Sequence, residues 1–186
     1  MRLFLAIELD PSIKDSLRGA IEELRAARAP VRWVRPENLH LTLKFLGETE
    51  EEKAAELCSL LAGVCRGIWP FEFDVLGAGV FPATSRPRVV WADIQEPSGT
   101  FGKLYGLIET VTEPLGWKPE RRGFSPHITL GRVKGNINLD RLKATIGDLK
   151  DRHWGTQRSD RLALYRSHLG PGGARYEVLR HIPFPG

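Results

Sequence analysis

The stretch LHLTLKFLG, residues 39–47, has the apolar alternation of a β-strand, but it carries a histidine at position 40 and a threonine at position 42. Side chains two residues apart on a strand point to the same face, so His40 and Thr42 share one face while the leucines occupy the other. The leucines are suited to a core. The polar pair is left over for a cleft.

The stretch PHITLGRVK, residues 126–134, repeats the pattern with His127 and Thr129. One histidine on a strand is usually a packing or surface residue, but a repeated His-apolar-Thr-Leu favours a shared role. The separation of 127 − 40 = 87 positions is close to half of the 186 residues. This spacing indicates two related halves, although identity between the halves is otherwise slight.

Outward from these strands, the chain alternates further strands with amphipathic helices. The final GPGG sequence at 170–173, between two β-rich runs, indicates a hairpin. We therefore predict an α+β fold with mainly antiparallel sheets. Helices are expected at 12–28, 49–66, 98–115 and 139–150, and additional strands at 2–9, 71–82, 86–94, 161–169 and 174–182.

Composition is that of a globular protein, with 41% hydrophobic and 27% charged residues. We expect one compact unit. A net charge of +4 favours anionic partners such as RNA or nucleotides. The first apolar run is too short for a signal peptide, and no segment has about 18 consecutive apolar residues. A cytoplasmic protein without membrane contact is expected.

The two cysteines, Cys58 and Cys65, are seven positions apart in a predicted helix. Their Cα atoms would be roughly 10 Å apart, which is too far for a disulfide. Free thiols are expected.

Convergence of the two strands on one cleft would bring two imidazoles and two hydroxyls together. Imidazole exchanges protons near neutral pH, and a threonine hydroxyl can hold a phosphate oxygen without adding charge. One neutral histidine could activate water while the other, protonated, donates to a departing oxygen. The pattern favours acid–base chemistry at phosphorus that requires no metal.

HLTLKFLG and PHITLGR resemble the two signature motifs of the 2H phosphoesterase superfamily. Together with RWVRPENLHLTLKFLG, GVFP, RPRVVWADI and FSPHITLGR, they resemble its bacterial and archaeal RNA 2′,3′-cyclic phosphodiesterases, also called 2′-5′ RNA ligases. The resemblance implies two pseudo-symmetric lobes, with antiparallel sheets lining a central cleft and helices packed outside. We predict a single domain, 1–186, whose lobes carry the motifs at 40–47 and 127–134.

The resemblance also implies a phosphate site lined by His40, Thr42, His127 and Thr129, and an activity that opens 2′,3′-cyclic phosphates to 2′-phosphates. It assigns His127 as the proton acceptor and His40 as the proton donor, an order that the residues alone leave open. ATP-independent 2′-5′ RNA ligation would be the reverse-type reaction. The expected partner is an RNA end or a nucleotide with a cyclic phosphate, bound by a monomer without a cofactor.

Arg132 matches a family position that helps to hold the phosphate, but it lies five residues beyond His127. Simple alternation would send it to the opposite face, unless the strand ends or bulges near Gly131. A surface charge is the alternative. Lys44 has the parity to face the cleft and to contribute to a positive rim.

Other residues fit the expected function less directly. Phe81 could form part of a base-stacking wall, and an arginine cluster could guide an RNA backbone, although a solvated charged face explains that cluster equally well. Ser125 lacks the turn of a nucleophile and is interpreted as structural. The cluster is Arg86, Arg88, Arg121 and Arg122, and the remaining histidines, interpreted as surface or packing residues, are His153, His168 and His181.

Three alternatives remain open from the sequence. An enzyme for a small cyclic phosphate, such as an ADP-ribose derivative, would need the same histidines. A non-catalytic RNA-end-binding module would keep its phosphate affinity without them. A metallohydrolase would use His40 and His127 as ligands, but the chain shows no His-x-x-x-His or Cys-x-x-Cys pattern.

Overall fold

The computed structural model describes residues 1–83, 86–120, 123–171 and 173–185, so Arg121 and Arg122 lie outside the described residues. The strands are β1 (Arg2–Glu8), β2 (Val31–Trp33), β3 (His40–Glu48), β4 (Phe71–Phe81), β5 (Val89–Gln95), β6 (His127–Val133), β7 (His153–Ser159), β8 (Arg161–Gly170) and β9 (Gly173–Pro183). The helices are α1 (Pro11–Arg25), α2 (Glu51–Val64), α3 (Thr100–Thr112) and α4 (Leu139–Asp148), with short 3-10 turns η1 (Pro36–Asn38) and η2 (Cys65–Gly67).

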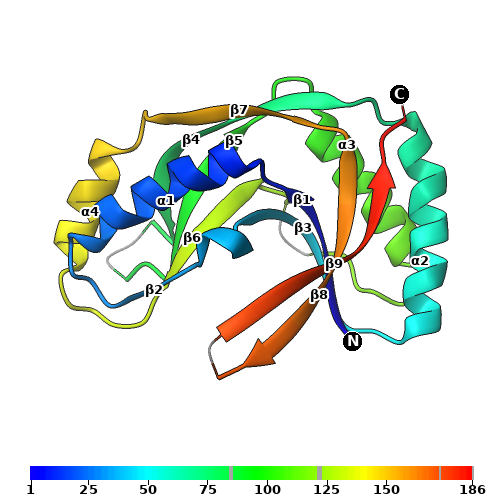
Figure 1. Cartoon of the computed structure of the whole chain (residues 1–186), viewed down its shortest axis with the longest axis horizontal. Helices are drawn as coiled ribbons and strands as arrows, with labels where there is room; N and C mark the ends of the chain where they lie inside the picture. Colours follow the sequence, from blue (N-terminus) through cyan, green and yellow to red (C-terminus); the bar gives the residue numbers. More distant parts are fainter. Residues whose placement is uncertain (84–85, 121–122, 172, 186) are drawn as a thin grey trace.

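In the described part of the chain, the strands form one continuous, curled sheet with antiparallel pairing. Its order is β7-β4-β5-β6-β3-β1-β8-β9, and β2 pairs with β6. The helices lie along the outside of the curl (Figure 1). The predicted α+β class is confirmed, and a single sheet contributes strands to both sides of the molecule.

Two lobes meet where β3 lies beside β6. The first lobe contains β1, β3, β8 and β9 with α2 and α3, and the second contains β2, β4, β5, β6 and β7 with α1 and α4 (Figure 1). Helix α1 follows β1 in sequence but packs on β7 and α4 across the molecule. Each lobe therefore combines segments from both halves of the chain, and the similarity of the lobes stays a prediction.

The core lies between the sheet and the helices. Helix α1 turns Ile13, Leu17, Ile21 and Leu24 to the sheet, each almost fully buried. Leu41 of β3 is also fully buried in this core. Burial of a side chain of this size contributes roughly 1.5–3 kcal/mol, so the apolar face of the central strand is firmly fixed.

No helix in the described residues combines the length and apolar content that crossing a bilayer requires. Both cysteines are free thiols, as expected, and Cys65 is buried at the C-terminal end of α2, where η2 begins.

Candidate active site

The two His-Thr strands are neighbours in the sheet. The paired position joins Leu41 of β3 to Ile128 of β6, and both side chains are fully buried. Continuing this antiparallel register by one residue in each direction puts each histidine of the pattern opposite the threonine of the other strand. The two polar pairs thus form a reciprocal arrangement on the face away from the core.

A cleft of about 300 Å³ opens on that face. His40, Thr42, Thr129 and Arg132 contribute to its walls. His127 is not among the lining residues; it is exposed and lies two residues before Thr129 on the same side of β6. The structure therefore brings four of the five predicted site residues to one cleft and places His127 at its border.

The two histidines are oriented in the same way. Nδ1 of His40 lies 2.7 Å from the carbonyl oxygen of Asn38. Nδ1 of His127 lies 2.9 Å from the carbonyl oxygen of Ser125. A carbonyl oxygen only accepts, so Nδ1 must carry hydrogen in both rings, and in the neutral form Nε2 has the lone pair. Each ring is held by the residue two positions earlier and leaves Nε2 for chemistry.

His40 lies among aromatic rings of the first lobe. The ring centroids of Phe4 and Tyr176 are 4.8 and 5.2 Å from that of His40. The pKa of His40 is lowered to about 4, mainly because the ring is buried; the hydrogen bond to Asn38 acts in the opposite direction, and the nearby charge of Lys14 adds to the lowering. His40 is consequently neutral in the free protein near pH 7.

Arg132 reaches the cleft because β6 is irregular. On β5, Trp91 pairs with Thr129 and the adjacent Val90 pairs with Gly131, so one additional residue is accommodated in β6. This bulge shifts the alternation of side chains along β6 by one residue and so turns Arg132 to the side of Thr129. Of the alternatives that the sequence leaves open for Arg132, the structure shows the bulge near Gly131.

A similar irregularity corrects the orientation expected for Lys44. Ala6 of β1 pairs with Thr42 and the adjacent Leu5 pairs with Lys44, so β3 also contains an additional residue. Lys44 turns into the core, where its Nζ lies 2.7 Å from a carboxylate oxygen of Glu109 on α3. The prediction that Lys44 faces the cleft is therefore wrong.

Phe45 takes the place that Lys44 was expected to occupy. It lines the cleft, and 62% of the residue's surface is exposed. The phenylalanine was not singled out from the sequence, because regular alternation hides it on the core side. The cleft therefore has an apolar wall that sequence reasoning missed.

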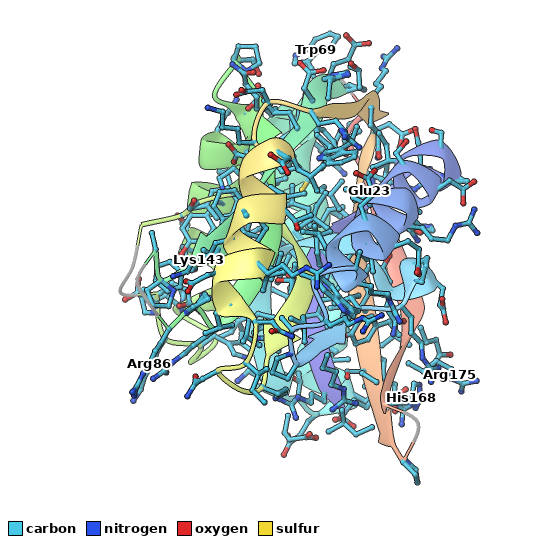
Figure 2. The ribbon with its side chains drawn as sticks, turned by 90° about the vertical axis from the view of Figure 1, so that its left-hand side faces the viewer. Glu23, Trp69, Arg86, Lys143, His168 and Arg175 are labelled. Carbon is cyan, nitrogen blue, oxygen red and sulfur yellow. The ribbon has the colours of Figure 1, made fainter. Side chains whose placement is uncertain are left out.

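The β8–β9 hairpin closes the cleft on the side of the first lobe. Ser167 and Tyr176 contribute to the lining, and Nδ2 of Asn38 donates to the carbonyl oxygen of Ala174 at 2.7 Å. Figure 1 shows this hairpin extending beyond the sheet, and Figure 2 shows His168 and Arg175 at the end of the molecule opposite Trp69. The hairpin thus attaches directly to η1, whose Asn38 carbonyl holds His40.

The other singled-out residues lie elsewhere. His153, His168 and His181 pair with Asp74, Glu177 and Glu8, in line with surface or packing roles. Phe81 and Arg88 line a separate depression rather than the cleft. Within the described ranges, no three side chains of His, Cys, Asp or Glu come together as a possible metal site.

A curled antiparallel sheet that carries paired His-x-Thr strands beside an arginine is the arrangement of a two-histidine phosphoesterase. The chain belongs to the LigT-like phosphoesterase family, whose sequence pattern matches residues 7–91 and 94–176.

Named relatives and solved structures extend this likeness over the whole chain. The RNA 2′,3′-cyclic phosphodiesterase of Methanothermobacter thermautotrophicus is 40% identical over 97% of this chain and 98% of its own length. That of Thermotoga maritima is 37% identical over 100% and 97%. The crystal structure of TT0787 of Thermus thermophilus has a TM-score of 0.82 and 31% identity, with coverage of 100% and 99%. E. coli LigT complexed with 3′-AMP has a TM-score of 0.78 and 30% identity, with coverage of 100% and 98%.

Proposed function

We propose that this protein hydrolyses the 2′,3′-cyclic phosphate at the 3′ end of RNA and leaves a 2′-phosphate. The observation that carries the proposal is the pair of histidines on adjacent strands, each with Nδ1 held by a backbone carbonyl and with no hydrogen-bond partner for Nε2 among the described residues. Relatives that are named RNA 2′,3′-cyclic phosphodiesterases and a LigT structure with 3′-AMP support the substrate class.

In the proposed reaction, Nε2 of His127 takes a proton from water as the water oxygen bonds to phosphorus. The bond between phosphorus and the 3′ oxygen breaks, and Nε2–H of His40 gives its proton to that oxygen. The phosphate stays on the 2′ oxygen. Hydroxyls of Thr42 and Thr129 and the guanidinium of Arg132 are proposed to hold the nonbridging oxygens, because hydrogen bonds to anionic oxygen strengthen as charge develops.

His40 must acquire a proton before it can act as the donor. Its pKa of about 4 in the free protein leaves it neutral near pH 7. A bound phosphate brings negative charge next to the ring, and nearby negative charge favours the imidazolium form. Substrate binding is therefore proposed to raise the pKa of His40 and to supply the acid only when the cyclic phosphate is present.

Metal independence follows from the same assignment, since the side chains supply acid, base and charge compensation. A 5′-hydroxyl in place of water would attack phosphorus as the bond to the 3′ oxygen breaks, and would form a 2′-5′ linkage without ATP, so the proposed ligation is the same displacement with another nucleophile rather than the reversal of hydrolysis. We also propose that the protein acts as a monomer in the cytoplasm.

The test is incubation of the wild-type protein with an oligonucleotide that ends in a 2′,3′-cyclic phosphate, in excess chelator. Phosphorus NMR identifies which hydroxyl keeps the phosphate. The expected product is the 2′-phosphate, formed at the same rate with and without chelator. A 3′-phosphate product would contradict the order of bond breaking, and loss of activity in chelator would contradict metal independence.

A second arm separates the RNA substrate from a small cyclic phosphate. The cyclic oligonucleotide, a cyclic mononucleotide and an ADP-ribose cyclic phosphate are compared at equal concentration. The proposal expects both RNA-type substrates to turn over faster than the ADP-ribose derivative. The reverse order would favour the small-molecule alternative.

A further inference from the structure

Two arginines face each other on the cleft side of the sheet. Arg32 of β2 pairs in register with Arg132 of β6, and Arg132 lines the cleft. The neighbours of Arg32, Val31 and Trp33, pack against the core, so Arg32 lies on the other side of its strand. Side chains directly opposite in antiparallel strands have Cβ atoms about 5 Å apart. Two permanently charged guanidinium groups thus share one small area.

No acidic side chain of the described residues neutralises this pair. The ion pairs found in residues 1–83, 86–120, 123–171 and 173–185 involve neither Arg32 nor Arg132, and Arg2, which also lines the cleft, takes part in none of them. Like charges directly opposite each other destabilise a sheet. An anion bound between the two arginines would relieve that repulsion.

The arginine pair lies further along the sheet than the predicted phosphate site. Thr129 pairs with Trp91 and Arg132 pairs with Val89, so two positions of β5 separate them, or about 7 Å. This spacing is on the scale of one nucleotide of an extended strand. A ligand phosphate at Thr129 therefore leaves room for another phosphate between the arginines.

The tip of the β8–β9 hairpin bounds this second position. Nη2 of Arg32 lies 3.0 Å from the place where a Cβ on Gly173 would be, so the guanidinium reaches from the second lobe to the hairpin of the first. Figure 1 shows the hairpin and β2 on the same side of the molecule. Arg32 therefore lies at the outer end of the cleft, where a strand leaving the histidines would pass.

We propose that Arg32 and Arg132 bind a second phosphate, namely the phosphodiester that joins the terminal nucleotide to the one before it. In this arrangement Arg132 lies between the terminal phosphate and the second phosphate, and Arg32 contacts the second phosphate. This inference rests on the proposed function and narrows it, because it makes the preferred substrate an oligonucleotide rather than a mononucleotide.

The test uses equilibrium binding of product analogues, so it does not depend on turnover. The ligands are a nucleoside 2′-phosphate, a dinucleotide with a terminal 2′-phosphate, and the same dinucleotide with an uncharged methylphosphonate linkage. The wild-type protein should bind the charged dinucleotide about tenfold more tightly than either other ligand, because only that ligand has a second phosphate for the arginines.

Replacement of Arg32 tests the residue itself. Arg32→Ala should weaken binding of the charged dinucleotide about tenfold and change the affinity for the nucleoside 2′-phosphate less than twofold. It should not weaken binding of the methylphosphonate dinucleotide any further. The affinity of Arg32→Lys should lie between wild type and Arg32→Ala, since lysine keeps the charge but not the planar fork. Arg158→Ala is the control, because it removes an exposed arginine from β7 at the far edge of the sheet.

Several outcomes would overturn the inference. Equal weakening of the nucleoside 2′-phosphate and the charged dinucleotide by Arg32→Ala would place Arg32 at the terminal phosphate or in a merely structural role. A methylphosphonate dinucleotide that binds as tightly as the charged dinucleotide would show that there is no second phosphate site. Thermal unfolding of Arg32→Ala should occur at the wild-type temperature or above it, because one member of a like-charge pair is gone. A protein that shows the expected binding but opens no cyclic phosphate would contradict only the proposed function.

Discussion

Strands β3 and β6 carry the same His-x-Thr pattern and diverge immediately after it. Each contains an additional residue beyond the threonine, and each consequently turns the fifth residue after its histidine into the cleft. That residue is Phe45 on β3 and Arg132 on β6. The repeated part provides two equivalent imidazoles, and the divergent part gives the cleft one apolar wall and one cationic wall.

The two imidazoles also differ in their surroundings. His40 is covered by the rings of Phe4, Tyr165 and Tyr176, whereas His127 is exposed at the start of β6. Their backbone anchors are alike, so the difference between the rings comes from neighbours that lie far away in sequence. Equal motifs thus acquire unequal surroundings from the fold around them.

The largest expected effect is loss of either imidazole. His40→Ala and His127→Ala should each lower kcat for a cyclic-phosphate oligonucleotide by about 10²–10⁴, because each removes one proton transfer. Steady-state kinetics measure the loss. His153→Ala is the matched control, since His153 pairs with Asp74 outside the cleft. A rate near wild type from either cleft variant would rule out a mechanism that needs both histidines.

The next effect concerns stability. The fourth residue after His40 is the buried Lys44, whereas the fourth residue after His127 is Gly131, which has no side chain to form an ion pair. Lys44→Ala should lower the free energy of unfolding by about 3–5 kcal/mol, because it leaves the Glu109 carboxylate without its cation in a largely buried place. Urea denaturation measures the change. The double variant Lys44→Met/Glu109→Leu should recover most of the loss, and a single variant as stable as wild type would show that the pair contributes little.

The sequence predicts the repeated part of the site well, because strand alternation and a double motif are local signals. His40 and Thr42 and their counterparts on β6 were placed on one face, and the structure agrees. Arg132 is singled out by the family resemblance, and Gly131 marks the possible bulge that lets it reach the cleft. A glycine allows such an irregularity to be anticipated, since it tolerates close approach of neighbouring chains, here Val31 and Trp33.

Prediction from the sequence fails where the alternation of side chains between the two faces of a strand shifts by one residue and no glycine marks the shift. Nothing in the letters of residues 42–45 indicates the additional residue in β3, so Lys44 was assigned to the cleft and Phe45 was overlooked. Arg32 was hidden for a different reason. Its position depends on the register between β2 and β6, and pairing between strands distant in sequence cannot be deduced from either strand alone.

A smaller effect should separate the two walls of the cleft. Phe45→Ala should weaken binding of a nucleoside 2′-phosphate by about 1–3 kcal/mol if the ring stacks on the base, and should leave binding of ribose 2′-phosphate unchanged. Arg132→Ala should weaken both ligands alike, because it acts on the phosphate. Titration calorimetry gives the four comparisons. Loss of ribose 2′-phosphate binding in Phe45→Ala would show that the phenylalanine shapes the phosphate site instead.

The smallest expected effect tests the protonation of His40 through anion binding. Sulfate is a suitable probe, because its charge does not change over the relevant pH range. The pKa of His40 is about 4 in the free protein, and a bound anion raises it, so binding takes up a proton. Sulfate affinity should therefore increase as pH falls from 7 toward 4.

The part of this increase that belongs to His40 is the difference between wild type and His40→Gln, which keeps a polar side chain but cannot titrate. We expect the wild-type affinity to rise several-fold more than that of the variant over this pH range. Calorimetric titrations in buffers of different ionisation enthalpy would measure the proton uptake directly. Equal pH dependence in both proteins would mean that His40 stays neutral beside a bound anion. The proton donor would then be His127 on β6 rather than His40 on β3.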